Sequence, residues 1–336
     1  MITLAEKVVT PIMTNDFSHD VVTGLAQAPK VLSSKYFYDD RGSELFQKIM
    51  GLSEYYPTDC EFAILERYKD ALLSLFSPEI FIPDSKPEHR YFDLVELGAG
   101  DGLKTKILLR HFLSCGAAFQ YAPIDISQAA LDGLSADLSR EFPELQVEAV
   151  CNEYGGGLER LRSESNHRRV LLFLGSSVGN FSKPQAEIFL KELRSHLSPK
   201  DLLLIGFDLV KNPRTILKAY DDSEGVTAEF NFNFLRRINR ELGGNFDCDR
   251  FIHYPTYHPV TGEAKSYLIS CDRQTVTLAK LGVTIEFEPW EAIHMEDSKK
   301  YRLSEIEEFC YQCGFEPVHG FLDEKGYFID ALWQVP

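Results

Sequence analysis

The feature that most constrains the fold is a regular alternation of short apolar runs with helix-like segments between residues 91 and 209. Each apolar run has the length of a strand buried on both faces, and the segments between them carry apolar residues at helical spacing. Strands joined by helices in this way form a parallel sheet with helices on both faces. The sequence therefore predicts an α/β fold with a doubly wound, mostly parallel sheet. The expected strands are 91–97, 119–126, 145–151, 169–175 and 201–209, and the expected helices are 104–113, 127–142 and 183–197.

Outside this stretch the pattern changes, which indicates a second lobe. Helices and antiparallel-looking strands are expected in the region that follows: helices at 214–222 and 227–242, and strands at 251–259, 264–278 and 283–289. The C-terminal residues predict a helix and a strand pair around a DEKG turn, which could complete the first sheet. We therefore expect two domains. A nucleotide-type domain is formed by 59–209 and 299–336, and an α+β lobe by 1–58 and 210–298.

Composition narrows the class of protein. The 336 residues carry a formal net charge of −16, which disfavours nucleic-acid binding because a polyanion would be repelled. No apolar stretch approaches the ~20 residues of a membrane span, and the N-terminus lacks a signal-peptide pattern. Seven scattered cysteines fit reduced thiols, and Cys310 and Cys313 lie on the apolar stripe of a helix, which favours core packing over a metal site. We expect a cytoplasmic monomer with a small-molecule substrate and no metal.

Three alternate glycines, Gly98, Gly100 and Gly102, stand between the first expected strand and the helix after it. Glycine tolerates the dihedral angles of a tight turn and lets a ligand approach the backbone. The spacing differs from the dinucleotide fingerprint G-x-G-x-x-G. Glu96, just before the turn, suits a ligand with an ammonium group, which points to S-adenosylmethionine (SAM) as the cofactor. Another nucleotide and a purely structural turn remain alternatives.

The next strand ends carry polar groups that suit the same ligand. Asp125, at the end of the second strand, is placed to accept hydrogen bonds from both ribose hydroxyls. Its other role, as a helix N-cap, is already filled by Ser127. Glu153 and Tyr154 follow the third strand and are placed to contact an adenine. Because the carboxyl ends of parallel strands share one edge of the sheet, these groups together favour a SAM site.

Longer blocks carry a more specific resemblance. The stretches KYFYDDRGSELFQKIMGLSEYYPT, ELGAGDGLKT, PIDIS, FLGSSVGNF, DLVKNPRTILKAYDDSEGVTAEFNFNFLRRINREL and HMEDSKKY look like successive blocks of the histidine Nα-methyltransferases of ergothioneine biosynthesis. The resemblance spans nearly the whole chain in the right order. It implies a Rossmann-like class I methyltransferase domain with a substrate-binding lobe, SAM as the methyl donor, and methylation of the α-amino group of L-histidine to hercynine.

The resemblance also implies roles for individual residues. Cofactor positions of the family fall on Gly98, Lys104, Asp125, Glu153 and Tyr154. Histidine-binding positions fall on Tyr55, Asn180, Tyr220, Glu296 and Ser298, and Tyr38 is similar to a tyrosine that lines the methyl-transfer site. We expect Tyr38, Asn180 and Tyr220 to be the catalytic residues.

These residue types suit an amino-acid substrate. Hydrogen bonds from Asn180 and Tyr220 would hold the carboxylate and point a neutral amine along the S–CH3 bond. Glu296 would accept a hydrogen bond from one imidazole nitrogen while Ser298 bonds the other. An aromatic ring without an N–H would leave that carboxylate buried and unpaired. A surface salt bridge between Glu296 and a neighbouring lysine is the alternative.

Two positions depart from the family pattern. Glu153 replaces the usual, shorter Asp and should still reach an adenine. Ser266 stands near a position where the family often has a methionine beside the imidazole. It keeps open a second substrate class, another aromatic amino acid such as tryptophan or a prenylated tryptophan. A catalytically silent SAM-binding protein is a further alternative, which the presence of Asn180, Tyr220 and Glu296 disfavours.

Overall fold

The computed structural model describes residues 16–77, 91–162 and 167–336. The chain divides into two compact units. The first unit consists of Met1–Tyr56 and Lys211–Lys299, and the second unit consists of Pro57–Val210 and Lys300–Pro336.

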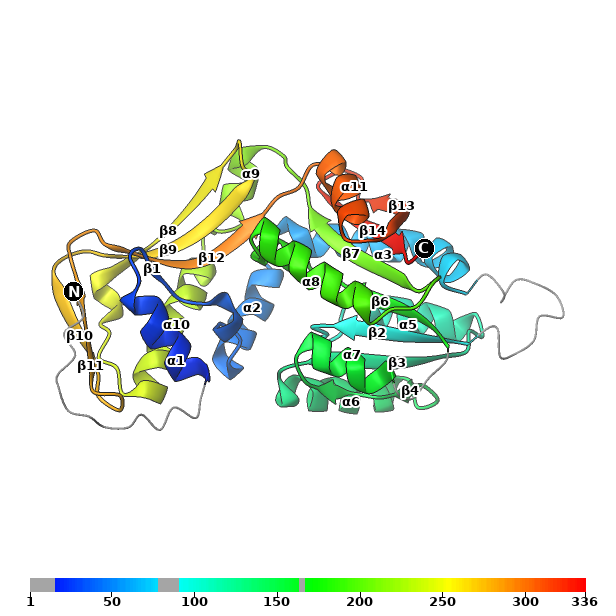
Figure 1. Ribbon diagram of the computed structural model, residues 1–336, viewed down its shortest axis with the longest axis horizontal. Coiled ribbons are helices and arrows are strands. Elements are labelled where there is room, and N and C mark those ends of the chain that lie inside the picture. The colour runs from blue at the N-terminus through cyan, green and yellow to red at the C-terminus, as the bar shows by residue number, and fades with distance from the viewer. Residues whose placement is uncertain (1–15, 78–90, 163–166) are drawn as a thin grey trace. The chain divides into compact units, whose positions relative to one another are not determined.

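The second unit is organised around one mixed sheet (Figure 1). Its strands are β2 (Phe92–Leu97), β3 (Phe119–Asp125), β4 (Gln146–Val147), β5 (Val150–Cys151), β6 (Arg168–Phe173), β7 (Leu202–Asp208), β13 (Glu316–Leu322) and β14 (Phe328–Gln334). Their order is β13-β14-β7-β6-β2-β3-β4, with β5 also paired to β3. The pairs from β7 to β4 are parallel, and the C-terminal hairpin joins β7 antiparallel through β14. The predictions of a mostly parallel sheet and of its completion by the C-terminal hairpin are confirmed.

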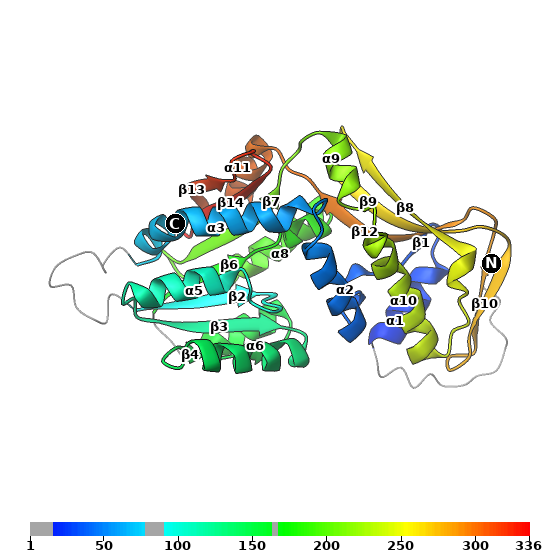
Figure 2. The same ribbon diagram turned by 180° about the vertical axis from the view of Figure 1, so that it is seen from behind.

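Helices cover both faces of this sheet. They are α3 (Tyr56–Phe76), α5 (Thr105–Ser114), α6 (Gln128–Glu141), α7 (Tyr154–Arg162), α8 (Lys183–Ser195) and α11 (Leu303–Gln312). Figure 1 shows α8 and α11 in front of the sheet, and the reverse view in Figure 2 shows α3 and α5 in front of it. Because both faces are covered, β2 and β7 are buried at every position, which explains why most of their residues are apolar.

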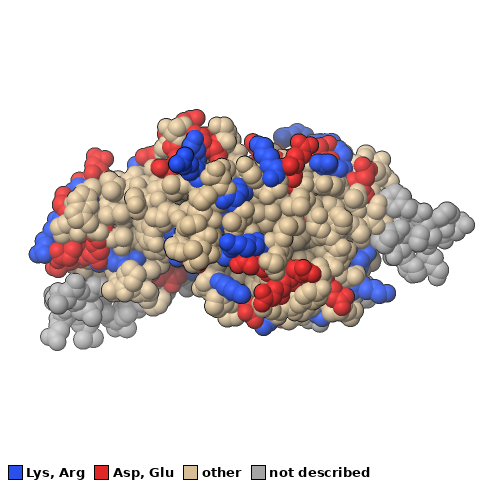
Figure 3. Space-filling model, turned by 90° about the horizontal axis from the view of Figure 1, so that it is seen from above, with Lys and Arg blue, Asp and Glu red and all other residues tan. Residues whose placement is uncertain are grey.

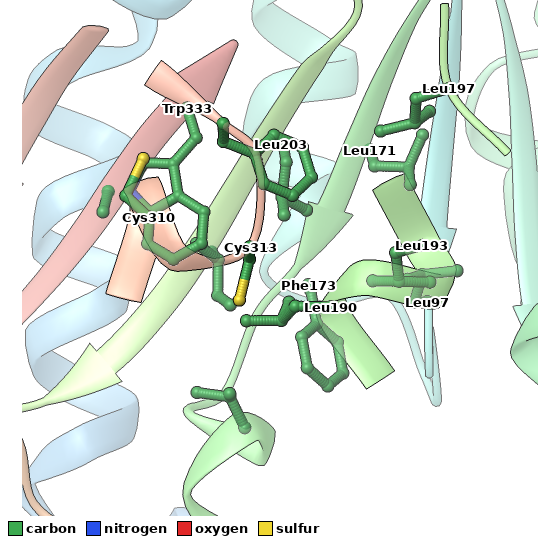
Figure 4. Close-up of a cluster of buried hydrophobic side chains, with 14 of the residues drawn as sticks. Leu97, Leu171, Phe173, Leu190, Leu193, Leu197, Leu203, Cys310, Cys313 and Trp333 are labelled. Atoms are coloured by element: carbon green, nitrogen blue, oxygen red, sulfur yellow. The ribbon is translucent and has the colours of Figure 1, made fainter. Parts of the chain in front are cut away.

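The core between α8, α11 and the sheet contains the pair Cys310 and Cys313 (Figure 4). Both side chains are buried, close to Leu190 and Trp333. Burial raises the pKa of the Cys310 thiol to about 12 and that of Cys313 to about 11. Both are therefore protonated core groups, which confirms the core-packing interpretation. Within the described part of the chain, no group of His, Cys, Asp and Glu side chains is arranged to hold a metal ion.

The first unit is an α+β lobe. Its strands are β1 (Lys30–Val31), β8 (Phe251–His258), β9 (Glu263–Ser270), β10 (Gln274–Leu278), β11 (Val283–Phe287) and β12 (Ala292–Lys299), and its helices are α1 (Asp16–Ala26), α2 (Asp40–Met50), α9 (Pro213–Lys218) and α10 (Val226–Leu242). One sheet has the order β1-β12-β9-β8, and β10 and β11 form a separate ribbon. The core is rich in aromatic rings, among them Phe17, Phe37 and Phe234, which pack between the helices and the sheet.

Several elements differ from the sequence prediction. The strand expected at 145–151 is divided into β4 and β5, and the strand expected at 264–278 is divided into β9 and β10. Helix α7, strand β12 and the two-residue strand β1 were not predicted. Helix α7 contains three successive glycines near its start, and glycine is a poor helix former. Strand β12 lies inside its sheet but carries polar residues, including His294 and Glu296, where an apolar pattern would be needed for recognition.

The chain passes from one unit to the other near residue 210 and again near residue 299. The second-unit segments next to these two points are bonded to each other. Leu209 forms a parallel bridge with Tyr301, and the Tyr301 N–H donates to the carbonyl of Asp208 at 2.9 Å. The ammonium of Lys300 lies 2.8 Å from the Asp208 carboxylate, and both side chains are 1% exposed. A fully buried ion pair therefore joins the ends of these two segments.

None of the helices in residues 16–77, 91–162 and 167–336 combines the length and apolar character that crossing a membrane requires. On the face shown in Figure 3, Lys and Arg side chains are interspersed with Asp and Glu.

Candidate active site

The glycine turn between β2 and α5 allows close approach of a ligand to the backbone. Gly98, Gly100 and Gly102 have φ angles of +73°, +52° and +64°, a region that residues with a Cβ rarely adopt. A Cβ on Gly98 would lie 2.9 Å from Tyr154 Oη, and a Cβ on Gly102 would lie 2.6 Å from Leu134 Cδ1. A Cβ on Gly100 would meet nothing within 4 Å. The turn is therefore packed against protein at its two ends and open in the middle.

Asp125 is held beside this turn by backbone N–H groups. Its Oδ2 accepts a hydrogen bond from Gly100 N at 3.0 Å, and its Oδ1 accepts one from Ser127 N at 2.9 Å. The Ser127 hydroxyl caps α6, as expected. A carboxylate oxygen can accept two hydrogen bonds, so each oxygen of Asp125 keeps the capacity to accept one from a hydroxyl. This donor set fits a ribose diol.

Tyr154, the first residue of α7, lies beside the same turn. Burial raises its pKa to about 12, and the nearby charge of Asp125 acts in the same direction. Its ring contacts Phe173 and Phe189, with centroids 5.8 and 5.7 Å away. Glu153, one residue earlier, has an exposed side chain. The fold thus brings Asp125 and Tyr154 to the glycine turn, and the aromatic surroundings and nearby carboxylate fit the adenosine part of SAM.

Glu96 lies inside the fold instead of at the ligand position expected from the sequence. Its Oε1 accepts a hydrogen bond from Thr105 at 2.6 Å, and its Oε2 accepts one from Tyr121. Burial raises the pKa of Glu96 to about 7, against the opposing effect of these hydrogen bonds and of the Lys104 charge. With both oxygens engaged, Glu96 braces β2 against α5 and β3.

Lys104, at the N-cap of α5, donates to the carboxylate of Glu61 on α3. The Glu61 side chain is fully buried and also accepts hydrogen bonds from Gly175 N, at 2.8 and 3.0 Å to its two oxygens. Gly175 begins the segment that leads to the short 3-10 helix η3 (Ser177–Asn180), where Asn180 is half-buried. One carboxylate therefore connects Lys104 to the segment that carries Asn180.

Three of the expected substrate residues come together in the first unit. The Tyr220 hydroxyl donates to Ser298 Oγ at 2.7 Å, and both side chains are buried. Glu296 lies two positions before Ser298 on β12, so their side chains share a face. Across the sheet, Glu296 is paired with Ser266 of β9. The Ser266 hydroxyl is buried and has no hydrogen-bond partner among the described residues, a deficit that a polar ligand can satisfy.

Tyr38 and Tyr55 are connected through the ring of Phe46. The ring centroids of Tyr38 and Phe46 are 5.4 Å apart and those of Phe46 and Tyr55 are 6.1 Å apart, both in edge-to-face geometry. Phe230 of α10 contacts Tyr38 and Phe46 at 5.7 and 6.0 Å. Phe46 packs against the core of the first unit, while Tyr38 is 39% exposed. This cluster places several aromatic rings near one another on the first unit.

Glu61 and Asp330 were not identified from the sequence. Both are acids with no exposed surface, and both interrupt an apolar pattern. Glu61 precedes Ile64 and Leu65 on the buried face of α3, and Asp330 lies within the apolar stretch of β14. A charged residue at a position where the periodicity requires an apolar one has to find a partner inside the fold. That misfit is the signal that could have found them.

Comparison with known proteins places this geometry in a family. Residues 17–335 match the model described as histidine-specific, SAM-dependent methyltransferases. A histidine N-alpha-methyltransferase of Mycobacterium tuberculosis is 34% identical over 92% of either chain. Ergothioneine biosynthesis protein 1 of Schizosaccharomyces pombe is 32% identical over 80% of this chain and 34% of that protein. An L-tryptophan methyltransferase of Psilocybe serbica is 27% identical over 92% of this chain and 90% of that protein. Because the family match extends over nearly the whole chain, the protein belongs to the histidine-specific, SAM-dependent methyltransferases.

Proposed function

We propose that this protein transfers methyl groups from SAM to the α-amino group of L-histidine, in successive steps that end at the trimethylated product hercynine. The observation that supports this best is the polar face of β12, where Tyr220 is hydrogen-bonded to Ser298 and Glu296 shares the same face. A neutral imidazole has one nitrogen that donates and one that accepts. A carboxylate and a hydroxyl side by side on one strand are complementary to that pair.

The cofactor is assigned to the glycine turn of the second unit. The open middle of the turn at Gly100 leaves room for a ligand against the backbone. Asp125 is assigned to the ribose hydroxyls, and Glu153 and Tyr154 to the adenine. Lys104, the ammonium at the end of the turn, is assigned to the carboxylate of the cofactor's amino-acid part, since a lysine presents three donors and Glu61 takes one.

When bound, SAM supplies a methyl group that is electrophilic because it is attached to a sulfonium sulfur. The residues of this chain then have to hold an unprotonated amine in line with that methyl group. Asn180 and Tyr220 are assigned to the substrate carboxylate, as neutral groups that add no buried charge. To donate to that carboxylate, the Tyr220 hydroxyl has to turn away from Ser298. Tyr38 is assigned to the methyl-transfer site, where its ring face would stabilise the increasingly methylated ammonium. Tyr55 is assigned to the substrate pocket.

The Tyr220 hydroxyl lies 2.7 Å from Ser298 Oγ, so a residue assigned to the substrate carboxylate and a residue assigned to the imidazole are hydrogen-bonded to each other. Ser298 is assigned to one ring nitrogen, and Glu296 is assigned to accept a hydrogen bond from the other. The unpartnered hydroxyl of Ser266, opposite Glu296, adds a further polar contact in the same place.

Tryptophan is the second candidate substrate, and the small Ser266 side chain favours it because a bulky ring needs room. The indole ring has one N–H to offer Glu296 but no acceptor for Ser298. Histidine can bond both Glu296 and Ser298, whereas indole can bond only Glu296. Histidine therefore ranks first, by about tenfold in affinity.

A calorimetric titration of L-histidine into the protein saturated with S-adenosylhomocysteine (SAH) tests the substrate assignment. We expect histidine to bind at least about tenfold more tightly than tryptophan, and Asp125→Ala to weaken SAH before it affects histidine. Binding of tryptophan in preference to histidine would reverse the ranking. An absence of binding for both would reject the assigned pocket.

We also propose that the chain acts as a cytoplasmic monomer. The described cysteines are free thiols, in line with a reducing compartment. Sedimentation of the purified protein tests the oligomeric state, and a stable dimer would contradict it.

A further inference from the structure

We propose that Glu61 and Asp330 form a proton-sharing acid pair that positions Lys104 for the cofactor, with Asp330 as the neutral partner. Neither acid belongs to the residues assigned to ligands above. The inference rests on the proposed assignment of Lys104 to the cofactor.

Glu61 is the centre of this arrangement. Its carboxylate accepts hydrogen bonds from the Lys104 ammonium and from the N–H of Gly175, and no part of the side chain is exposed. Space for it is provided by Gly206 of β7, where a Cβ would lie only 2.6 Å from Glu61 Oε1. The glycine turn after β2 and the turn after β6 are therefore tied to one buried carboxylate. Lys104, with its side chain 18% exposed, connects that carboxylate to the surface of the turn.

Asp330 lies next to this centre. It is paired with Gly206 across β14 and β7, and its side chain has no exposed surface. Neither of its oxygens has a hydrogen-bond donor among the described residues. The charged groups that act on it are Glu61, which disfavours its ionisation, and Lys104, which favours it. A buried carboxyl with no donor for its oxygens is stable when it carries a proton and donates that proton to a neighbour.

The charges of the cluster lead to the same assignment. Burial, and then the charge of Glu61, raise the pKa of Asp330 well above its usual range. Glu61 already accepts hydrogen bonds from an ammonium and a backbone N–H, so the shared proton belongs on Asp330. With Asp330 neutral, one carboxylate balances one ammonium. A second negative charge at Asp330 would compete with the cofactor carboxylate for Lys104.

Substitutions at Asp330 distinguish a neutral acid from a carboxylate. The amide of Asp330→Asn donates to Glu61 as a protonated acid does, whereas Asp330→Ala removes the donor. By calorimetry at neutral pH, we expect Asp330→Asn to bind SAH within about twofold of the unsubstituted protein and Asp330→Ala to bind it about tenfold more weakly. Equal loss in both variants, or loss in the Asn variant alone, would show that Asp330 acts as a carboxylate and would overturn the inference.

Glu61→Gln tests the other member of the pair. It keeps the shape of the side chain but turns a donor towards the Lys104 ammonium, so we expect SAH to bind at least about tenfold more weakly. The control is Glu66→Gln, an exposed position on the same helix, which should leave SAH affinity unchanged. Circular dichroism of each variant identifies any that fail to fold. If Glu61→Gln does not fold, Glu61→Asp takes its place, and we expect that variant to retain part of the SAH affinity. SAH affinity unchanged in Glu61→Gln would contradict the inference.

Lys104→Met separates failure of this inference from failure of the cofactor assignment. If Lys104→Met leaves SAH affinity unchanged, the assignment of Lys104 is wrong and the inference falls with it. If Lys104→Met weakens SAH while the Glu61 and Asp330 variants do not, the assignment stands and the acid pair is rejected.

Discussion

Asp330 is a residue whose ionisation the fold disfavours. Its pKa in the folded protein is raised well above the ordinary value, chiefly by burial, while in the unfolded chain it ionises near pH 4, about its ordinary value. Above that pH the unfolded state binds fewer protons at this site than the folded state, so its contribution to stability falls as the pH rises towards the folded pKa. Asparagine cannot ionise, so an asparagine at this position does not lower the free energy of unfolding as the pH rises.

We therefore predict that Asp330→Asn raises the melting temperature relative to the unsubstituted protein, and that the difference grows between about pH 5 and about pH 8. Thermal unfolding followed by circular dichroism across this range measures it. A difference that stays constant or shrinks with rising pH would mean that Asp330 is ionised in the fold.

Glu296 is the residue on which discrimination between substrates depends. Glu296→Ala removes the acceptor for the imidazole N–H and should lower kcat/KM for histidine by about 30-fold or more, equivalent to about 2 kcal/mol for a charged hydrogen bond. SAH affinity should stay within about twofold, because the cofactor is assigned to other residues. Steady-state kinetics and calorimetry together test this. Histidine kinetics that do not change would remove Glu296 from the pocket.

At the scale of elements, the glycine turn joins β2 to α5 in a conformation that needs glycine. Gly98→Ala would place a Cβ 2.9 Å from Tyr154 Oη at a φ of +73°. We expect SAH affinity to fall by about tenfold or more, since strain and displacement of Tyr154 both act at the site. Gly116→Ala is the matched control, with a φ of +70° and nothing within 4 Å of the added Cβ.

Gly116→Ala should lower stability through the same backbone strain, about 1–2 kcal/mol, without affecting SAH affinity. Loss of affinity in both variants would show that general destabilisation, rather than the turn itself, is responsible.

The buried ion pair of Asp208 and Lys300 joins the end of β7 to the start of the segment Lys300–Pro336. Lys300→Met leaves the Asp208 carboxylate buried without its cation, which typically costs about 3–5 kcal/mol. Chemical denaturation should show this as a lower midpoint. The double substitution Asp208→Asn with Lys300→Met should restore much of the loss, because no charge is then left unpaired. If Lys300→Met is as stable as the unsubstituted protein, the ion pair does not contribute to stability.

The elements that were predicted and those that were missed differ in a physical way. Strands such as β2 and β7 were recognised because burial on both faces favours apolar residues on both faces of the strand. Strand β12 was missed because one of its faces carries Glu296 and Ser298, which serve the proposed pocket instead of a core. Helix α7 was missed because its early glycines oppose helix formation and are tolerated only where neighbouring elements pack closely.

The same distinction applies to the site. The glycine turn and Asp125 follow from local spacing, so their association was predictable, and the hydrogen bond from Gly100 N joins them. Glu61 reaches Lys104 from 43 positions earlier in the sequence, and Asp330 lies on the C-terminal hairpin, where it is paired with Gly206. No local pattern contains such contacts. Glu96 was expected beside the ligand but is buried, with its oxygens turned to Thr105 and Tyr121.

At the scale of the whole molecule, the residues assigned to the proposed reaction come from both units. The cofactor residues and Asn180 belong to the second unit, and Tyr38, Tyr220, Glu296 and Ser298 belong to the first. The family match extends across both, from residue 17 to residue 335. Methyl transfer is therefore expected to be a property of the complete chain.

The most direct test of the proposed activity is to incubate the protein with L-histidine and SAM carrying an isotope-labelled methyl group, and to locate the label in the product by nuclear magnetic resonance and mass spectrometry. We predict that the label appears on the α-nitrogen, with the trimethylated amino acid as the final product. Label on a ring nitrogen, or no transfer to histidine while tryptophan is methylated, would contradict the proposed function.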